Sequence, residues 1–245
     1  MLGYIRYGDG PKKPELGESR LPGGVFLTLR VRESAHPNHP LARRRVLAGA
    51  KRLRELGARS AVFPMDFPYT QLFIRQGIVP VDTLPLRRHL AAPLVRRRLE
   101  SMGLSPTQAV VAVSAERLSR EAMDAVRLLA LSFRYVLLWG GGGEELARSL
   151  RREYGVSLLL GPSRDQLDRA DALLLFSPRQ DLALRNPVLY TLYPGGEAGA
   201  GRLPLQLPAA VVEQLDPNCD QEQMAAALYS LGGITAESLL AEIPC

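Results

Sequence analysis

The chain has 245 residues, 46% of them hydrophobic, and a formal net charge of +6 at pH 7. This length and this apolar content exclude a disordered chain and allow one large α/β domain or two lobes of about 100 residues each. No run of about 18 apolar residues is present and the N-terminus lacks a signal-peptide segment, so we expect a cytoplasmic protein without membrane spans.

The positive charge comes mainly from arginine, because lysine occurs only at positions 12, 13 and 51. Basic clusters such as Arg43–Arg45 and Arg96–Arg98 fall on predicted amphipathic helices, where the solvated face is the usual place for charge. No helix-turn-helix spacing, RNP-type motif or zinc finger accompanies them. We therefore expect no specific nucleic-acid binding.

Metal and disulfide chemistry have little support in the sequence. The two cysteines, Cys219 and Cys245, form neither a CxxC pair nor the framework of a secreted fold. His36 and His39 have the spacing of a metal-binding pair, but the third histidine, His89, lies on a predicted helix. The sequence therefore predicts no metal site.

The first half of the chain predicts one β/α unit after an irregular start. Residues 1–24 are punctuated by Gly and Pro and are expected to be irregular, apart from a short edge strand over LGYIRYG. Residues 25–104 form the first predicted unit, in which Pro93 is expected to kink or split the last helix. Its strands are predicted at 25–31, 60–64 and 78–82, and its helices at 40–56, 69–76 and 85–102.

The second half predicts a further β/α unit over residues 105–200 and a helical tail over residues 201–245. The apolar runs AVVAVSA, YVLLWG, VSLLLG and ALLLFS alternate with amphipathic segments, and Ser119 is placed to cap the helix that follows the first run. We predict an α/β fold, a mainly parallel Rossmann-like three-layer sandwich in one or two lobes. The sequence does not decide the oligomeric state, and it allows a homo-oligomer.

Ligands of open parallel sheets bind beyond the carboxyl ends of the strands, so the residues that follow each predicted strand are the candidate site. A Gly-rich loop between a strand and a helix lets backbone amides approach a phosphate, and the helix dipole favours negative charge there. The candidates for ligand binding are Gly140, Gly141, Gly142, Gly143, Ser163, Arg164 and Ser177, and those for proton transfer are Asp66, Asp82, Ser114 and Glu116.

The four glycines allow two interpretations. Gly140 and Gly142 match the first two positions of a dinucleotide fingerprint, whereas Glu145 occupies the third. Glu144 and Glu145 suit the first turn of a helix but repel a phosphate placed at the same point. The loop is therefore either a phosphate cradle or a flexible turn with an acidic helix start.

The stretch from Tyr135 to Pro178 combines this loop with a basic strand end, Ser163-Arg164, which suits a 2′-phosphate, and with a later strand ending in Ser-Pro. In that order it resembles the NADP-binding half of shikimate-dehydrogenase-like enzymes, which implies NADP as a ligand. The interval after Arg164 is shorter than the β-α unit of that family, and its Lys-Asp catalytic pair has no counterpart. The chain is therefore not assigned to it.

The candidates for proton transfer also have structural alternatives. Asp66 and Asp82 follow successive predicted strands and form either an acid-base pair or the caps of the next helices. Ser114 is not part of a G-x-S-x-G elbow, which argues against a hydrolase triad. Trp139 either stacks on a flat ligand or closes the core.

The leading hypothesis is a cytoplasmic Rossmann-like protein that binds a nucleotide, NADP among them, or another phosphorylated small molecule at the glycine loop, with catalysis undecided. The first alternative is a non-catalytic α/β scaffold or assembly protein. The second alternative is a two-lobed lyase or isomerase, built like uroporphyrinogen-III synthase, that binds a polycarboxylate between the halves through Arg87, Arg88 and Arg96.

Overall fold

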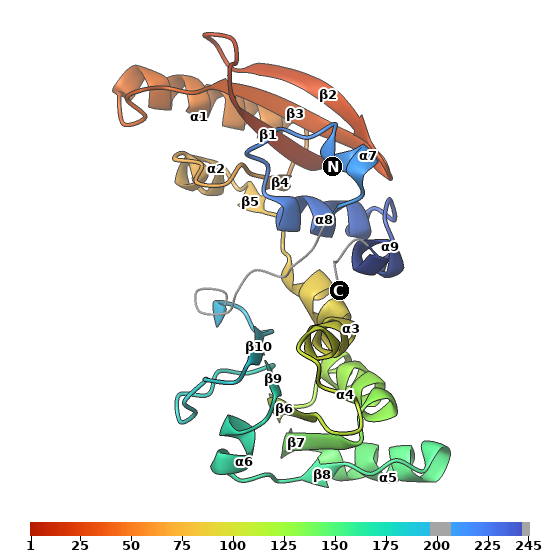
Figure 1. The fold of residues 1–245 in the computed structure, drawn as a ribbon. Coiled ribbons are helices and arrows are strands. Elements are labelled where there is room, and N and C mark those ends of the chain that lie inside the picture. Colours follow the sequence, from red (N-terminus) through yellow and green to blue (C-terminus); the bar gives the residue numbers. More distant parts are fainter. Residues whose placement is uncertain (197–206, 242–245) are drawn as a thin grey trace. The chain divides into compact units, whose positions relative to one another are not determined.

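The structure, a computed structural model, describes residues 1–196 and 207–241 and divides into two compact units (Figure 1). Among the described residues, unit 1 comprises residues 1–83 and 207–241, and unit 2 comprises residues 84–196. Each unit contains a five-stranded sheet with helices between its strands. The chain therefore has the predicted α/β fold with mainly parallel strands. Among the described residues, every helix is too short or too polar to cross a membrane.

The sheet of unit 1 has the strand order β2-β3-β1-β4-β5, in which β2 runs antiparallel to β3 and the other neighbours are parallel. The elements of unit 1 are β1 (Leu2–Gly8), β2 (Glu15–Leu21), β3 (Gly24–Arg32), α1 (Pro40–Glu55), β4 (Ser60–Val62), α2 (Thr70–Arg75), β5 (Val79–Pro80), α7 (Ala209–Val212), α8 (Gln221–Ser230) and α9 (Ala236–Ala241).

The strand predicted over LGYIRYG is present as β1, but it is not an edge strand, and residues 1–24 also contain β2 in place of the expected loop. β1 lies between β3 and β4, and its neighbouring residues Tyr4 and Ile5 are each 1% exposed, on opposite faces of the sheet. β2 pairs only with β3 and carries mostly exposed side chains, as an edge strand does. Its polar composition explains why the apolar pattern does not reveal it.

The C-terminal segment is part of unit 1 rather than a separate tail. The guanidinium of Arg6 donates to the Asp216 carboxylate, with an Nε–Oδ2 distance of 2.7 Å, and the Asp216 amide donates to the Tyr4 hydroxyl at 3.0 Å. The Phe63 amide donates to Gln223 Oε1 at 3.1 Å. Burial raises the pKa of Cys219 to about 12, so this thiol stays protonated at neutral pH.

The sheet of unit 2 is entirely parallel, with the strand order β10-β9-β6-β7-β8. The elements of unit 2 are α3 (Leu84–Ser101), β6 (Val110–Arg117), α4 (Arg120–Ser132), β7 (Tyr135–Gly141), α5 (Gly143–Tyr154), β8 (Leu159–Leu160), α6 (Arg164–Asp168), β9 (Ala172–Leu175) and β10 (Val188–Thr191). α3 continues past Pro93 as one helix, and it contacts α4, β9 and β10.

Helices lie on both faces of the unit 2 sheet (Figure 1). On one face Leu167 of α6 packs against Ala112 and Leu173 of the strands, and α4 and α5 cover the opposite face. Ser119 caps α4 as predicted, since its hydroxyl accepts a hydrogen bond from the amide of Ala122 at 3.2 Å. This three-layer arrangement leaves the strand ends as the place where polar residues can gather.

Replacing Asp216 with Asn tests how the C-terminal segment is held. We expect the free energy of unfolding to fall by about 1–2 kcal/mol, the range for hydrogen bonds to charged groups reduced for partial exposure. Urea unfolding followed by circular dichroism measures the change. Glu18→Gln, an exposed substitution on β2, is the control, and an equal effect of both substitutions would show that the contact does not hold the segment.

Candidate functional site

The strand order of unit 2 locates the expected ligand site. The chain begins at the central strand β6, adds β7 and β8 on one side, and then crosses to add β9 and β10 on the other side. This is the 3-2-1-4-5 order of a doubly wound sheet, in which ligands bind where the strand order reverses. In unit 2 that switch point is at the carboxyl ends of β6 and β9.

Three of the predicted residues meet at this switch point. Ser114 on β6 is fully buried, and Ser177 follows β9. The Ser177 hydroxyl accepts a hydrogen bond from the Glu116 amide at 2.9 Å, so the segments that follow β6 and β9 are tied together. The Ser114 hydroxyl accepts a hydrogen bond from Nη1 of Arg179 at 3.2 Å. The structure therefore brings Ser114, Glu116 and Ser177 together.

Arg179 is the residue of this site that the sequence analysis missed. Its guanidinium carbon lies 3.9 Å from the centroid of the Trp139 ring, and its Nε and Nη2 each donate to the Asp181 carboxylate at 2.7 Å. The arginine side chain is 10% exposed and that of Asp181 is 50% exposed. Hydrogen bonds from Arg179 lower the pKa of Asp181 to about 2, so the pair is ionised at neutral pH. The sequence did offer one signal for this residue, since Arg179 directly follows the Ser-Pro pair at the end of a predicted strand.

Packing requires glycine at position 140 and leaves little room for a side chain at position 143. A Cβ on Gly140 would lie 1.9 Å from the Ala115 carbonyl oxygen, and the φ of Gly140 is +147°. Gly143 is buried, and a Cβ there would lie 3.1 Å from a methyl group of Leu138 and 3.2 Å from one of Leu160. A bound phosphate is therefore not needed to explain these two positions.

The other two glycines are exposed at the start of α5. Gly141 pairs with Arg117 at the end of the β6–β7 ladder. Gly142 has a φ of +86° and begins the helix without a side-chain cap, and the side chains of Glu144 and Glu145 are exposed. The loop follows β7, whereas the dinucleotide loop of such sheets follows the first strand, which is β6 in this unit. The glycines therefore lie beside the switch point, one strand away from the usual place.

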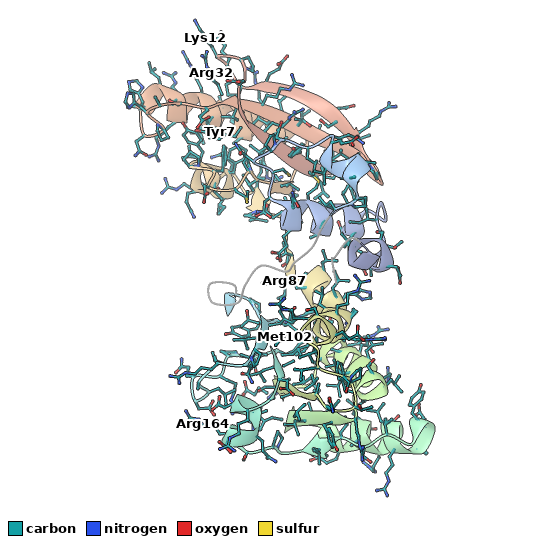
Figure 2. The ribbon with its side chains drawn as sticks, in the orientation of Figure 1. Tyr7, Lys12, Arg32, Arg87, Met102 and Arg164 are labelled. Atoms are coloured by element: carbon teal, nitrogen blue, oxygen red, sulfur yellow. The ribbon has the colours of Figure 1, made fainter. Side chains whose placement is uncertain are left out.

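Ser163 and Arg164 lie after β8, two strands from β6. The Ser163 hydroxyl and Gln166 form a capping box at the start of α6. The Arg164 side chain, labelled in Figure 2, is 63% exposed and lies 3.6 Å from the Asp168 carboxylate. Both residues thus have local structural roles, and after the Arg179 hydrogen bond the charge of Arg164 also helps to lower the pKa of Asp181.

The structure separates the four candidates for proton transfer between the units. Asp66 and Asp82 belong to unit 1, and Ser114 and Glu116 belong to unit 2. Asp66 is exposed with a left-handed φ of 56°, and Asp82 is also exposed. Tyr69 occupies the N-cap position of α2 without a side-chain capping bond, so Asp66 does not have the alternative capping role.

The arginines that we considered for carboxylate binding are engaged within unit 2. Nε of Arg88 donates to the Leu192 carbonyl at 2.9 Å, and Arg96 pairs with Glu100 at 2.9 Å. Arg87 is 3% exposed. Residues 1–196 and 207–241 contain no group of three or more His, Cys, Asp or Glu side chains arranged to hold a metal ion.

Comparisons with known proteins do not assign the chain to a family. No family model matches the sequence, and no curated protein matches it significantly. Among solved structures, aspartate transcarbamoylase from Trypanosoma cruzi in complex with N-(phosphonacetyl)-L-aspartic acid is similar at 13% identity and a TM-score of 0.34, over 97% of this chain and 82% of that one. A shikimate 5-dehydrogenase-like protein matches at 12% identity and a TM-score of 0.27, over 100% and 93%. Scores of this size do not establish a relationship.

Replacing Gly140 with Ala tests whether packing requires the glycine. The added Cβ collides with the Ala115 carbonyl, so we expect the free energy of unfolding to fall by about 3 kcal/mol or more. Gly141→Ala is the matched control, because its nearest contact is at 3.6 Å, and we expect it to change stability by about 0.5 kcal/mol or less. Thermal and urea unfolding measure both, and equal effects would contradict the packing argument.

The pair between Arg179 and Asp181 predicts a pH dependence of Trp139 fluorescence. The pKa of Asp181 falls from 3.8 to about 2 on folding, so the pair stabilises the fold above pH 3.8 and this contribution is lost as pH falls through about 2. We expect emission from Trp139, the single tryptophan, to stay constant from neutral pH to about pH 4 and to change as pH falls through about 2. Asp181→Asn should change the emission at pH 7, while Asp165→Asn, on the exposed surface of α6, should not.

Proposed function

We propose that this chain is a cytoplasmic Rossmann-like protein whose unit 2 binds a nucleotide or another phosphorylated small molecule at the carboxyl edge of its sheet. The observation that carries the proposal is the meeting of Ser114, Ser177 and Arg179 at the switch point between β6 and β9. This is the point of a doubly wound sheet at which ligands bind, and arginine suits the geometry of phosphate oxygens.

Each side chain of the site has a separate proposed role. Arg179 supplies positive charge, and its position is fixed by the Trp139 ring and by the buried Ser114 hydroxyl. Trp139 is partly buried, and its indole offers an aromatic surface next to the strand end. The amides at the start of α5, after Gly142, lack a side-chain cap and favour a negative charge. No reaction is assigned to these groups.

Asp181 competes directly with any anion for Arg179. The carboxylate uses both the Nε and the Nη2 of the arginine, and Nη1 donates to Ser114. These contacts leave one N–H on Nη1 and one on Nη2 unused, so a phosphate that binds through Nε and Nη2 must displace Asp181. Because the Asp181 side chain is half exposed, its release into solvent does not require the core to open. The ion pair thus sets the affinity of the proposed site.

The second candidate function is a scaffold without a ligand, and the same contacts favour it. Arg179 already has partners in Ser114, Asp181 and the Trp139 ring, so the strand ends are closed by the chain itself. The packing of Gly140 and Gly143 also needs no ligand. This hypothesis predicts a stable assembly that no nucleotide stabilises.

A ligand panel separates the two functions. NAD, NADP, ATP, GTP and S-adenosylmethionine are tested by thermal shift, where a ligand at 100 times its dissociation constant adds about 2.7 kcal/mol of stability. A ligand bound at Arg179 should also change the emission of Trp139. Arg179→Gln should weaken this binding by about tenfold or more, and Asp181→Asn should strengthen it because the competing carboxylate is gone. Arg185→Gln, an exposed substitution in the same loop, should have no effect.

Two outcomes would contradict the binding proposal. One is the absence of any thermal shift across the panel together with a stable homodimer, which supports the scaffold. The other is binding that leaves Trp139 emission and the Arg179→Gln variant unaffected, which places the ligand elsewhere. Circular dichroism of each variant shows that its fold is intact.

A further inference from the structure

We propose that unit 1 contains a second binding site, a basic cavity formed by Lys12, Arg32 and Arg45, that takes a small organic polyanion with two or more phosphate or carboxylate groups. This site is independent of the site proposed for unit 2, because all of its residues belong to unit 1. Its volume is about 370 Å³, within the range of small-molecule pockets.

The cavity lies beyond the carboxyl ends of two neighbouring parallel strands of unit 1. Lys12 comes from the loop after β1, Arg32 is the last residue of β3, and Arg45 projects from α1, which follows β3. Figure 2 shows Lys12 and Arg32 at the same end of the sheet. Ligands of parallel α/β sheets bind at this edge. A loop, a strand end and a helix thus bring their cationic side chains to one cavity.

The three cations are not neutralised by the part of the chain that the structure describes. Lys12, Arg32 and Arg45 form no ion pair with a described carboxylate, although Glu33 also lines the cavity. Nη1 of Arg45 donates a hydrogen bond to the Lys12 carbonyl at 3.4 Å, which joins the loop to α1 without cancelling charge. Three like charges around one cavity, against a single carboxylate, favour an anion.

The wall of the cavity adds neutral hydrogen-bonding groups on a rigid base. The Tyr69 side chain is 2% exposed and is packed edge-to-face against Phe67, with ring centroids 5.5 Å apart. Burial raises the pKa of Tyr69, so its hydroxyl stays protonated beside Ser34. Val31 and Val46 are almost fully buried and form the apolar floor. The cavity therefore suits an organic molecule that carries anionic groups better than a simple ion.

A second basic groove, along α4 and α5 of unit 2, differs because most of its arginines are paired with carboxylates. It is lined by Arg127, Arg148 and Arg152 and has a volume of about 540 Å³. Arg127 pairs with Asp124 and Arg152 with Glu153, and Nε of Arg148 donates to the Glu144 carbonyl. Because two of its three arginines already have carboxylate partners, we place the anion site in unit 1.

Isothermal titration calorimetry of the full chain at low ionic strength tests the proposal, with pyrophosphate and citrate as probes. We expect at least one probe to bind, and Arg32→Gln and Arg45→Gln each to weaken it by about tenfold. Arg44→Gln is the matched control, since Arg44 is an exposed arginine of α1 that does not line the cavity. Arg179→Gln, which removes the charge of the unit 2 site, should leave this binding unchanged.

The outcomes decide both the proposal and the ligand chemistry. Binding of pyrophosphate alone assigns the cavity to phosphorylated compounds, and binding of citrate alone assigns it to polycarboxylates. The proposal is overturned if neither probe binds at millimolar concentration, or if Arg44→Gln weakens binding as much as Arg45→Gln does. It is also overturned if Arg179→Gln abolishes the binding, because the anion then sits in unit 2. Lys12→Gln provides a further variant in a loop, should a change on α1 or β3 impair folding.

Discussion

The pairing of β6 with β7 on one side and β9 on the other is the constraint on which unit 2 depends. Ser114 is in register with Trp139 of β7 and with Leu175, the last residue of β9, so β9 ends beside these two residues while β6 and β7 continue. The loop after β9 can then place Arg179 in contact with both Ser114 and Trp139. The candidate site is thus a consequence of strand register.

The sequence predicted the fold class well because apolar runs and amphipathic segments alternate so regularly in residues 105–178. It also placed Ser114, Glu116 and Ser177 at the sheet edge, where the structure has them, since residues that follow a buried strand lie at that edge. It could not give the strand order, because that depends on which strands pair rather than on the pattern within any one of them. For this reason it could not show that the switch point lies between β6 and β9, one strand away from the glycine loop.

The remaining differences arise where contacts join residues far apart in the chain. Arg179 meets Ser114 across 65 positions, and Arg45 meets the Lys12 carbonyl across 33, so no local pattern reveals either contact. β2 was not predicted because an edge strand can be polar over most of its length and then lacks the alternating apolar pattern. Local sequence patterns therefore predict helices, strands and the residues at strand ends. The charged clusters can be recognised only when the three-dimensional structure shows which strand ends are neighbours.

Unit 1 is built from the first and the last parts of the described chain, and this order has a consequence for synthesis of the protein. Its sheet contains Arg6, which needs Asp216 as a partner 210 positions later, whereas residues 84–196 of unit 2 are translated between the two. During translation, the face of β1 that contacts the Asp216 segment therefore stays uncovered until the whole parallel sheet of unit 2 has been synthesised. The lobe that begins first is completed last, and a nascent chain stopped before Asp216 lacks one layer of it.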